Sequence, residues 1–411
     1  MRKNIIIYFI TLLTAFNLSL NLEADANLHS RFQSTNRLKE KYAVVSGQSI
    51  IGMLAAAVLA KSGYQVDCFE IRDEYTRNIQ WAARQSLVNE LASIDEKLAD
   101  SFIKEVVKPI YKGSTHVYAD GYRRNKSHDG LERGDPSRLP STCDEMMAMS
   151  SVAIAEAKVF ETFLKKYLQS FPNVHLYKGY FIEGHQIPDL IVIAEGFNSK
   201  SRNALNIPLI PAAEDKLQIA GTLGIDSGGI MLKQWRNEDG QMRLTGIIGR
   251  ADSDSTWIVA DIDPAKIETQ DDIDTEFRRI ASEALSLPIK TVEGLKISGP
   301  IDDKPVTSFL LKQAICETAT KGDNVVLIGD AVGAGHWSVG GGMQTGSVCH
   351  IERLKTLLLD IELGMPKAAA LNKYSDAVIT DTKTWIEVSA KDQSRPVFQK
   401  GPFNREVRQI D

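Results

Sequence analysis

The chain has 411 residues, of which 43% are hydrophobic and 25% charged, and its formal net charge at pH 7 is −5. A chain of this length and composition can bury a large core, as two or three domains or as one large domain with an insertion. Its mild acidity argues against a nucleic-acid scaffold, because phosphate backbones bind to basic surfaces. The four cysteines are widely spaced and form no CxxC pair, so neither a disulfide framework nor a metal site is indicated.

The first 26 residues have the layout of a secretory signal peptide. Arg2 and Lys3 precede a largely apolar run, residues 5–22, and Ala24-Asp25-Ala26 forms a small-x-small cleavage site. The run is also close to a membrane span in length, so an uncleaved anchor is a second interpretation, and a wrongly assigned start is a third. The segment indicates export or membrane association, whereas the cysteine usage suits the cytoplasm.

The first motif of the folded part lies within residues 42–70. The pattern there is a short apolar strand, an Ala/Leu-rich helix and a second strand, which predicts a βαβ unit. Gly47, Ser49 and Gly52 form G-x-S-x-x-G between the first strand and the helix, close to the G-x-G-x-x-G of dinucleotide-binding units. Glu70 ends the second strand, where an acid is expected to bind ribose hydroxyls. The segment therefore predicts a dinucleotide site.

Apolar periodicity predicts the next elements. Residues 72–94 fit a helix that carries Arg77 and Arg84, and residues 151–170 fit an amphipathic helix with apolar pairs every four residues. The polar stretch between them, residues 113–150, is interpreted as an insertion or a mobile loop. Two further strands are predicted at residues 174–177 and 189–194, and the second ends at Glu195-Gly196.

Between residues 207 and 323 the pattern changes to successive extended segments, which predict an antiparallel sheet. The predicted strands span residues 217–225, 229–235, 241–249 and 255–261. A helix is expected at residues 271–284 and another extended piece at residues 305–314.

The last motif lies in residues 324–360. A buried parallel strand is predicted at residues 325–328, and it ends at Gly329-Asp330. A loop with five glycines follows, and Met343 opens a helix that runs to about Asp360. Glycines let the backbone approach a ligand closely, and a helix start presents free N–H groups. This combination predicts a cofactor cradle. A terminal helix is expected at residues 368–389.

The βαβ motif with Glu70, the segment DLIVIAEG at residues 189–196 and the late Gly329-Asp330 together resemble the FAD-dependent aromatic-hydroxylase type of flavoprotein monooxygenases, which have the p-hydroxybenzoate hydroxylase fold. The resemblance covers about residues 42–85, 189–202 and 324–350. It implies an α/β fold, with a Rossmann-like FAD-binding domain and an inserted antiparallel β-sheet substrate domain. Residues 70–78 and Trp337 look most like the flavin domain of the MICAL oxidoreductases.

On this resemblance the chain divides into six parts. They are a signal peptide or anchor (1–26), a linker (27–40), the first part of the FAD-binding domain (41–206), a mainly β substrate domain (207–323), the second part of the FAD-binding domain with a C-terminal helix (324–390), and a tail (391–411).

The resemblance implies FAD as cofactor, NADPH or NADH as a transient reductant, and O2 with a small organic molecule as substrates. Oxygen transfer through a flavin C4a-hydroperoxide is the implied chemistry. The cofactor-binding residues that it implies, together with two nearby arginines, are Gly47, Ser49, Ile50, Gly52, Glu70, Arg77, Arg84, Glu195, Gly196, Gly329, Asp330, Gly340, Gly342, Met343 and Gln344.

His336 and Trp337 lie in the glycine loop and are the candidate catalytic residues, as a substrate-facing wall with His336 as a proton shuttle. The alternative is a loop histidine that packs on an indole. Two other functions stay open: a flavin-dependent dehydrogenase, oxidase or reductase on the same fold, and a flavin-binding protein without turnover.

Overall fold

The computed structural model describes residues 41–109, 115–117, 123–125, 134–138, 151–181, 187–225, 230–236, 242–249, 254–301, 304–337 and 340–393. The predicted signal peptide or anchor, the linker, most of the 113–150 stretch and the tail beyond residue 393 lie outside the described residues. Within the described ranges, no helix combines the length and the apolar character that crossing a membrane requires.

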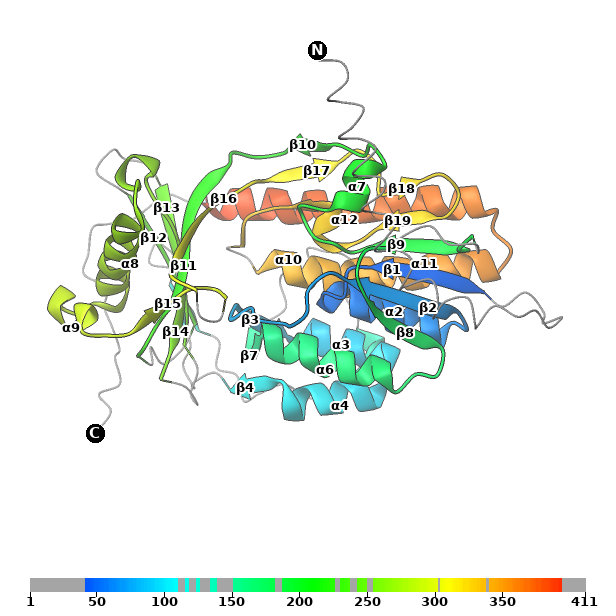
Figure 1. Ribbon diagram of the computed structural model, residues 1–411, viewed down its shortest axis with the longest axis horizontal. Coiled ribbons are helices and arrows are strands. Elements are labelled where there is room, and N and C mark those ends of the chain that lie inside the picture. The colour runs from blue at the N-terminus through cyan, green and yellow to red at the C-terminus, as the bar shows by residue number, and fades with distance from the viewer. Residues whose placement is uncertain are drawn as a thin grey trace, which may run out of the picture. The chain divides into compact units, whose positions relative to one another are not determined.

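A six-stranded, mostly parallel sheet carries the first and the last motifs (Figure 1). Its order is β18-β19-β9-β1-β2-β8, and only β18 runs antiparallel, against β19. The strands are β1 (Tyr42–Ser46), β2 (Gln65–Glu70), β8 (Val174–Lys178), β9 (Leu190–Ile193), β18 (Thr320–Lys321) and β19 (Val325–Leu327). All five strands predicted here are confirmed to within a residue at each end. They form because short apolar runs bounded by polar residues can be buried on both faces of a parallel sheet.

Helices cover this sheet and share its large hydrophobic core. In the helix after β1, the hydroxyl of the N-cap Ser49 accepts a hydrogen bond from the Gly52 N–H (3.4 Å), and Gly63 follows the last turn at φ +83°. Small alanines on every side let this helix pack tightly between neighbours. The helices of this part are α2 (Ile50–Lys61), α3 (Gln85–Ile94), α4 (Glu96–Glu105), α6 (Ala157–Gln169), α7 (Lys200–Ala204), α11 (Ile351–Glu362) and α12 (Lys367–Gln393).

Two of the predicted helices begin later in the structure than expected, so the prediction is wrong for their first residues. Residues 72–84 are not helical: β3 (Gln80–Arg84) is a strand, and α3 begins only at Gln85. Likewise, residues 151–156 form strand β7 (Ser151–Glu156), which pairs with β3 on one side and with β4 (Val107–Pro109) on the other. The sequence of β7, SVAIAE, is short enough to fit either period, and pairing with two distant strands decides for the strand.

The predicted antiparallel sheet is confirmed, with all four strands in place. They are β11 (Lys216–Leu223), β12 (Ile230–Arg236), β13 (Met242–Gly249) and β14 (Thr256–Asp261), and β15 (Ile297–Ser298) and β16 (Thr307–Leu311) both pair with β11. Figure 1 shows α8 (Gln270–Leu285) on the side of this sheet that faces away from the parallel sheet. A capping box starts α8, since Thr269 and Asp272 each bind the other's backbone N–H.

The two faces of the antiparallel sheet are set by strict alternation along its strands. Ile219 and Ile258 point into the core under α8. Their neighbours Ala220 and Trp257 point the other way, into a smaller apolar cluster that Trp337 also joins. This second face is therefore turned toward the glycine loop.

The glycine loop leads into a long helical stretch that starts two residues earlier than predicted. It consists of α10 (Gly341–Gln344), a π-helical turn (Thr345–His350) and α11. A π turn inserts one extra residue and rotates the side chains that follow. Here it brings the imidazole of His350 under the turn at Gly329. A small sheet of β10 (Leu209–Pro211), β17 (Ala314–Cys316) and β20 (Gly333–Ala334) precedes the loop.

A buried acid on α3 gives a prediction for stability. Glu90 is fully buried, its Oε1 lies 2.9 Å from Lys355 Nζ, and burial raises the pKa of Glu90 to about 7 despite that lysine. Because the folded-state pKa lies above the ordinary value of 4.5, the free energy of unfolding should fall as the pH rises between these two values. We expect Glu90→Gln to remove this fall, on the order of 3 kcal/mol, in urea unfolding measured across the window. The exposed Glu105→Gln should keep it, and an unchanged slope in Glu90→Gln would contradict the assignment.

Candidate functional site

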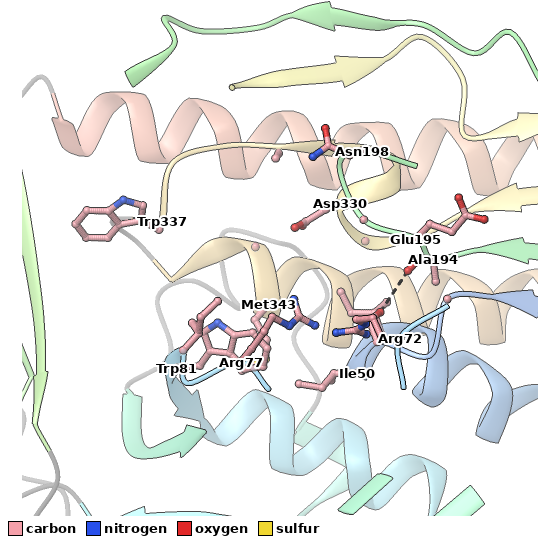
Figure 2. Close-up of a pocket in the computed structure, with 18 of the residues that line it drawn as sticks. Ile50, Arg72, Arg77, Trp81, Ala194, Glu195, Asn198, Asp330, Trp337 and Met343 are labelled. Atoms are coloured by element: carbon pink, nitrogen blue, oxygen red, sulfur yellow. Dashed lines mark hydrogen bonds between the residues drawn. The ribbon is translucent and has the colours of Figure 1, made fainter. Parts of the chain in front are cut away.

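A cavity of about 920 Å³ opens at the carboxyl ends of β1, β2, β9 and β19 and reaches the second face of the antiparallel sheet. Ligands of open α/β sheets bind at such strand ends, at the point where the strand order reverses. Here β2 and β9 lie on opposite sides of β1. Figure 2 shows Trp81 and Trp337 toward one end of the cavity and Glu195, Asn198 and Arg72 toward the other.

The turn after β1 depends on two glycines. Gly47 has φ +105°, and a Cβ there would lie 2.6 Å from the carbonyl oxygen of Ala194, the residue after β9. A Cβ on Gly52 would lie 1.9 Å from the Gly47 carbonyl oxygen. The helix start, the turn and β9 are thus packed backbone against backbone, and the N-terminus of α2 points at the cavity, where Ser49 and Ile50 line it.

Glu70 lines the cavity at the end of β2 and is held by arginine. Arg72 Nη2 binds Glu70 Oε2 (2.8 Å), and the backbone N–H of Gln48 donates to the same oxygen (3.2 Å). Burial alone would raise the pKa of Glu70, but the hydrogen bonds from Arg72 outweigh it and lower the pKa. Behind it, the fully buried Glu161 pairs with both Arg72 and Arg77. These charges are therefore fixed before any ligand arrives.

Glu195 lies at the end of β9 and accepts hydrogen bonds from three serines. Ser46 donates to Oε1 (2.5 Å) and Ser199 to Oε2 (2.9 Å), while Ser201 donates through both its hydroxyl and its backbone N–H. Burial works against ionisation, yet the hydrogen bonds lower the pKa of Glu195. The acid thus stays ionised and orders the segment around Gly196, a cavity-lining residue at φ +80°.

Asp330 differs from these two acids because no residue in the described part of the chain donates a hydrogen bond to its carboxylate. It lines the cavity after β19, and burial raises the pKa of Asp330 to about 6, with Arg77 opposing the rise. When it is ionised, this carboxylate can accept a hydrogen bond from a hydroxyl group of a ligand.

A buried histidine holds the turn beside Asp330. The Gly329 N–H donates to His350 Nδ1 (2.9 Å), and His350 Nε2 lies 3.1 Å from the Thr382 hydroxyl, which itself donates to the Val378 carbonyl (2.9 Å). His350 must therefore carry its proton on Nε2. Burial, helped by Arg353, lowers the pKa of His350 to about 3, so it stays neutral and keeps its acceptor for Gly329.

The glycine loop lines the cavity at Gly335, Gly340 and Gly342, and it also packs closely against α12. Trp385 of α12 occupies the space beside Gly341 and Gly342, where added Cβ atoms would lie 2.1 and 2.9 Å from its indole ring. A Cβ on Gly335 would similarly meet Ile386 at 3.0 Å. Gly340, at φ +62°, has only Arg84 Nη2 within reach of a Cβ, at 3.6 Å, and lines the cavity.

The cavity brings together fourteen of the seventeen predicted site residues. Those that line it are Gly47, Ser49, Ile50, Glu70, Arg77, Arg84, Glu195, Gly196, Gly329, Asp330, Trp337, Gly340, Gly342 and Met343. Gly52, His336 and Gln344 do not line it. His336 is fully buried behind Trp337, with ring centroids 4.8 Å apart, and Ser86 donates to the buried side-chain oxygen of Gln344 (3.3 Å). The arrangement of His336 favours packing on the indole over a proton shuttle.

Several lining residues were not predicted as site residues. Arg72 and Asn198 follow Glu70 and Gly196 closely in the sequence, so their nearness to a strand-end acid could have identified them. Trp385 and Phe309 carried no such signal, because they come from elements far along the chain whose packing is not readable locally. Trp81 and Trp257 also line the cavity.

No protein-family model and no curated protein matches the chain. Solved structures match over most of its length. The p-nitrophenol 4-monooxygenase PnpA from Pseudomonas putida DLL-E4 is 15% identical, with 88% of this chain and 90% of that chain covered at a TM-score of 0.64. PqsL, a probable FAD-dependent monooxygenase from Pseudomonas aeruginosa, is 14% identical, with coverages of 85% and 94% and a TM-score of 0.61.

Klebsiella pneumoniae HpxO, solved with FAD and uric acid, is 17% identical, with 86% of this chain and 87% of that chain covered at a TM-score of 0.58. At such identities the likeness is one of fold. The local likeness to the MICAL flavin domain stays a prediction. The chain has the fold of the FAD-dependent monooxygenases of the aromatic-hydroxylase type.

Proposed function

We propose that the protein is an FAD-dependent monooxygenase that uses NADH or NADPH and O2 to oxygenate a small organic molecule. The observation that carries the proposal is Asp330, a carboxylate without a hydrogen-bond donor in the described part of the chain, at the strand-end cavity of this fold. The division into a two-part FAD-binding region (residues 41–206 and 324–390) and a β-rich substrate region (residues 207–323) belongs to the same proposal.

The residues present fit an adenine dinucleotide. The N–H groups of Ile50 and Ile51 at the start of α2 have no partner within the helix and would face the diphosphate, with Arg77 and Arg84 as further counter-charges. Glu70 and Asp330 would accept hydrogen bonds from the cofactor's hydroxyl groups. The helical stretch that begins at Gly341 would place its positive end near the flavin ring.

When bound, FAD would supply electron transfer from the nicotinamide and the activation of O2. The chain's own residues would orient the ring and keep water from it. Trp81, Trp257 and Trp337 line the end of the cavity next to the antiparallel sheet, and an apolar enclosure of this kind excludes water from a reacting centre. His336, behind Trp337, would support that wall and not carry protons.

The first experiment is an absorbance spectrum of the purified full chain, followed by the same spectrum with NADPH or NADH in air. We expect flavin bands near about 450 nm that the nicotinamide bleaches. Oxygen consumption coupled to substrate oxygenation would support a monooxygenase. Consumption without oxygenation would favour the dehydrogenase or oxidase, and bound flavin without turnover would favour a binding protein. A protein that neither contains nor takes up FAD would refute the proposal.

Asp330 predicts a pH dependence of FAD affinity. If the ionised acid accepts a hydroxyl hydrogen bond, affinity should fall about tenfold for each pH unit below about 6, because the acid is progressively protonated there. We expect Asp330→Asn to weaken binding by about 10- to 100-fold at pH 8 and to flatten the profile, as measured by flavin fluorescence titration. The exposed Asp323→Asn should keep the normal profile. A profile that persists in Asp330→Asn would assign the titration to another group.

A further inference from the structure

The cavity has two chemically different ends. Its charged lining residues come from the parallel sheet, from the segments that follow its strands, or from β3. They are Glu70, Arg72, Arg77, Arg84, Glu195, Lys200 and Asp330. The described lining residues of the antiparallel sheet carry no charge. Their side chains are those of Ile248, Trp257, Val259, Phe309 and Leu311, while Gly246 adds bare backbone and the Ile247 side chain points into the core under α8. The charged end suits the cofactor, so the apolar end is left for the substrate.

Trp337 forms part of the wall at the apolar end and is fixed on two sides. Its indole N–H donates to the side-chain oxygen of Gln218, a fully buried residue on β11. Its ring fills the space over Gly246 on β13, where an added Cβ would lie 2.6 Å from Cζ3 of the indole. The antiparallel sheet thus fixes both the position and the orientation of the indole ring.

The residues behind Trp337 are themselves tied down. The amide nitrogen of Gln218 binds the buried Asp261 on β14, whose other oxygen accepts the Leu244 N–H (3.0 Å). His336 lies within 3.4 Å of Asp261, and its carbonyl accepts the Trp385 indole N–H (3.1 Å). Because every member of this network is buried and bonded, rotating Trp337 would leave polar groups unpaired.

We propose that the apolar end binds an uncharged, flat and largely apolar substrate against Trp337, and that Gln218 and Gly246 are positioning residues that set the place of this wall. An ionised ligand would lose its hydration against these side chains and gain no counter-charge from the antiparallel sheet. Arg72 and Arg77 are paired with Glu70 and Glu161, and under the proposed function Arg77 and Arg84 face the diphosphate of FAD. A wall held in advance also spares the ligand the cost of ordering it. The inference rests on the proposed function for the role of the bound molecule as substrate.

The test compares two probes of nearly equal shape, 2-naphthamide and the anionic 2-naphthoate. Binding is measured by calorimetry on the FAD-supplemented protein, with the flavin spectrum recorded in parallel. We expect 2-naphthamide to bind at least about 10-fold more tightly than 2-naphthoate and to perturb the flavin bands. Equal or tighter binding of 2-naphthoate would overturn the inference.

Variants then test the wall. Gly246→Ala should tip the indole into the cavity and lower the affinity for 2-naphthamide at least about 10-fold, while the affinity for FAD stays unchanged. Adding Trp337→Phe to Gly246→Ala makes room for the new methyl group but removes the N–H that donates to Gln218, so it should restore part of the binding, which a general loss of structure would not do. Gln218→Leu should lower the affinity for 2-naphthamide in the same way as Gly246→Ala.

The control Gly294→Ala, whose Cβ would meet only Thr291 O at an ordinary 3.6 Å, should bind both probes normally. Normal 2-naphthamide binding by both Gly246→Ala and Gln218→Leu would overturn the role of the wall. If FAD itself does not bind, the proposed function fails, and the calorimetric difference between probes and between variants still decides whether the apolar end is a binding site.

Discussion

Replacing Gly52 with alanine is expected to remove FAD binding almost entirely, with an affinity loss of at least about 100-fold. The new Cβ would lie 1.9 Å from the Gly47 carbonyl oxygen and 3.1 Å from the Ala194 side chain. Two of the three nearest atoms belong to backbone, so α2 must move away from the turn after β1 and carry Ser49 and Ile50 with it. The free energy of unfolding should fall by about 1–3 kcal/mol. FAD titration and urea unfolding measure the two effects.

Gly294→Ala again serves as the control, since it adds the same methyl group without a clash. A second comparison is Gly63→Ala. Gly63 has a positive φ of +83°, but a Cβ there would meet nothing within 4 Å. The substitution should cost some stability through backbone strain alone and leave FAD affinity intact. Wild-type affinity in Gly52→Ala would show that the close approach of helix and turn does not shape the site.

Replacing His350 with leucine should weaken FAD binding by about 10- to 100-fold, although His350 does not line the cavity. Leucine leaves the buried Gly329 N–H without its acceptor, and such an orphaned donor costs about 1–3 kcal/mol. The turn can recover a partner only by shifting, and Asp330 shifts with it. His350→Asn offers an oxygen near the position of Nδ1, so we expect it to bind FAD within about threefold of the wild type.

Arg353→Leu separates this effect from a loosened helix pair. It breaks the ion pair with Asp381 (3.0 Å), which joins α11 to α12 next to the contact between His350, the last residue of the π-helical turn, and Thr382 of α12. It should destabilise the protein without changing FAD affinity. Equal losses of affinity in Arg353→Leu and His350→Leu, or no rescue by asparagine, would count against a positioning role for His350.

The strands of both large sheets could be predicted because their signals are local. A buried parallel strand is a short apolar run, and an antiparallel strand with two different faces alternates. The acids at positions 70, 195 and 330 could be placed near one another for a related reason, since the carboxyl ends of parallel strands meet at one edge. Residues 80–84 and 151–156 were misjudged because their partners lie far away in the chain, and pairing overrode their helical pattern.

The sequence by itself determined which residues could form a nucleotide cavity: the strand-end acids, the turn glycines and the helix start at Ser49. Only the tertiary structure decided what each glycine accommodates and which aromatic residue faces the cavity. Trp385 comes from the last helix and takes the space beside Gly341 and Gly342, so both positions also require glycine for packing. His336 and Trp337 are adjacent in the chain, yet one is buried and the other lines the cavity, because Gln218 and Gly246 of a distant sheet hold the indole in place. The contacts of Trp337 with Gln218 and Gly246 join residues more than ninety positions apart, and no local pattern encodes them.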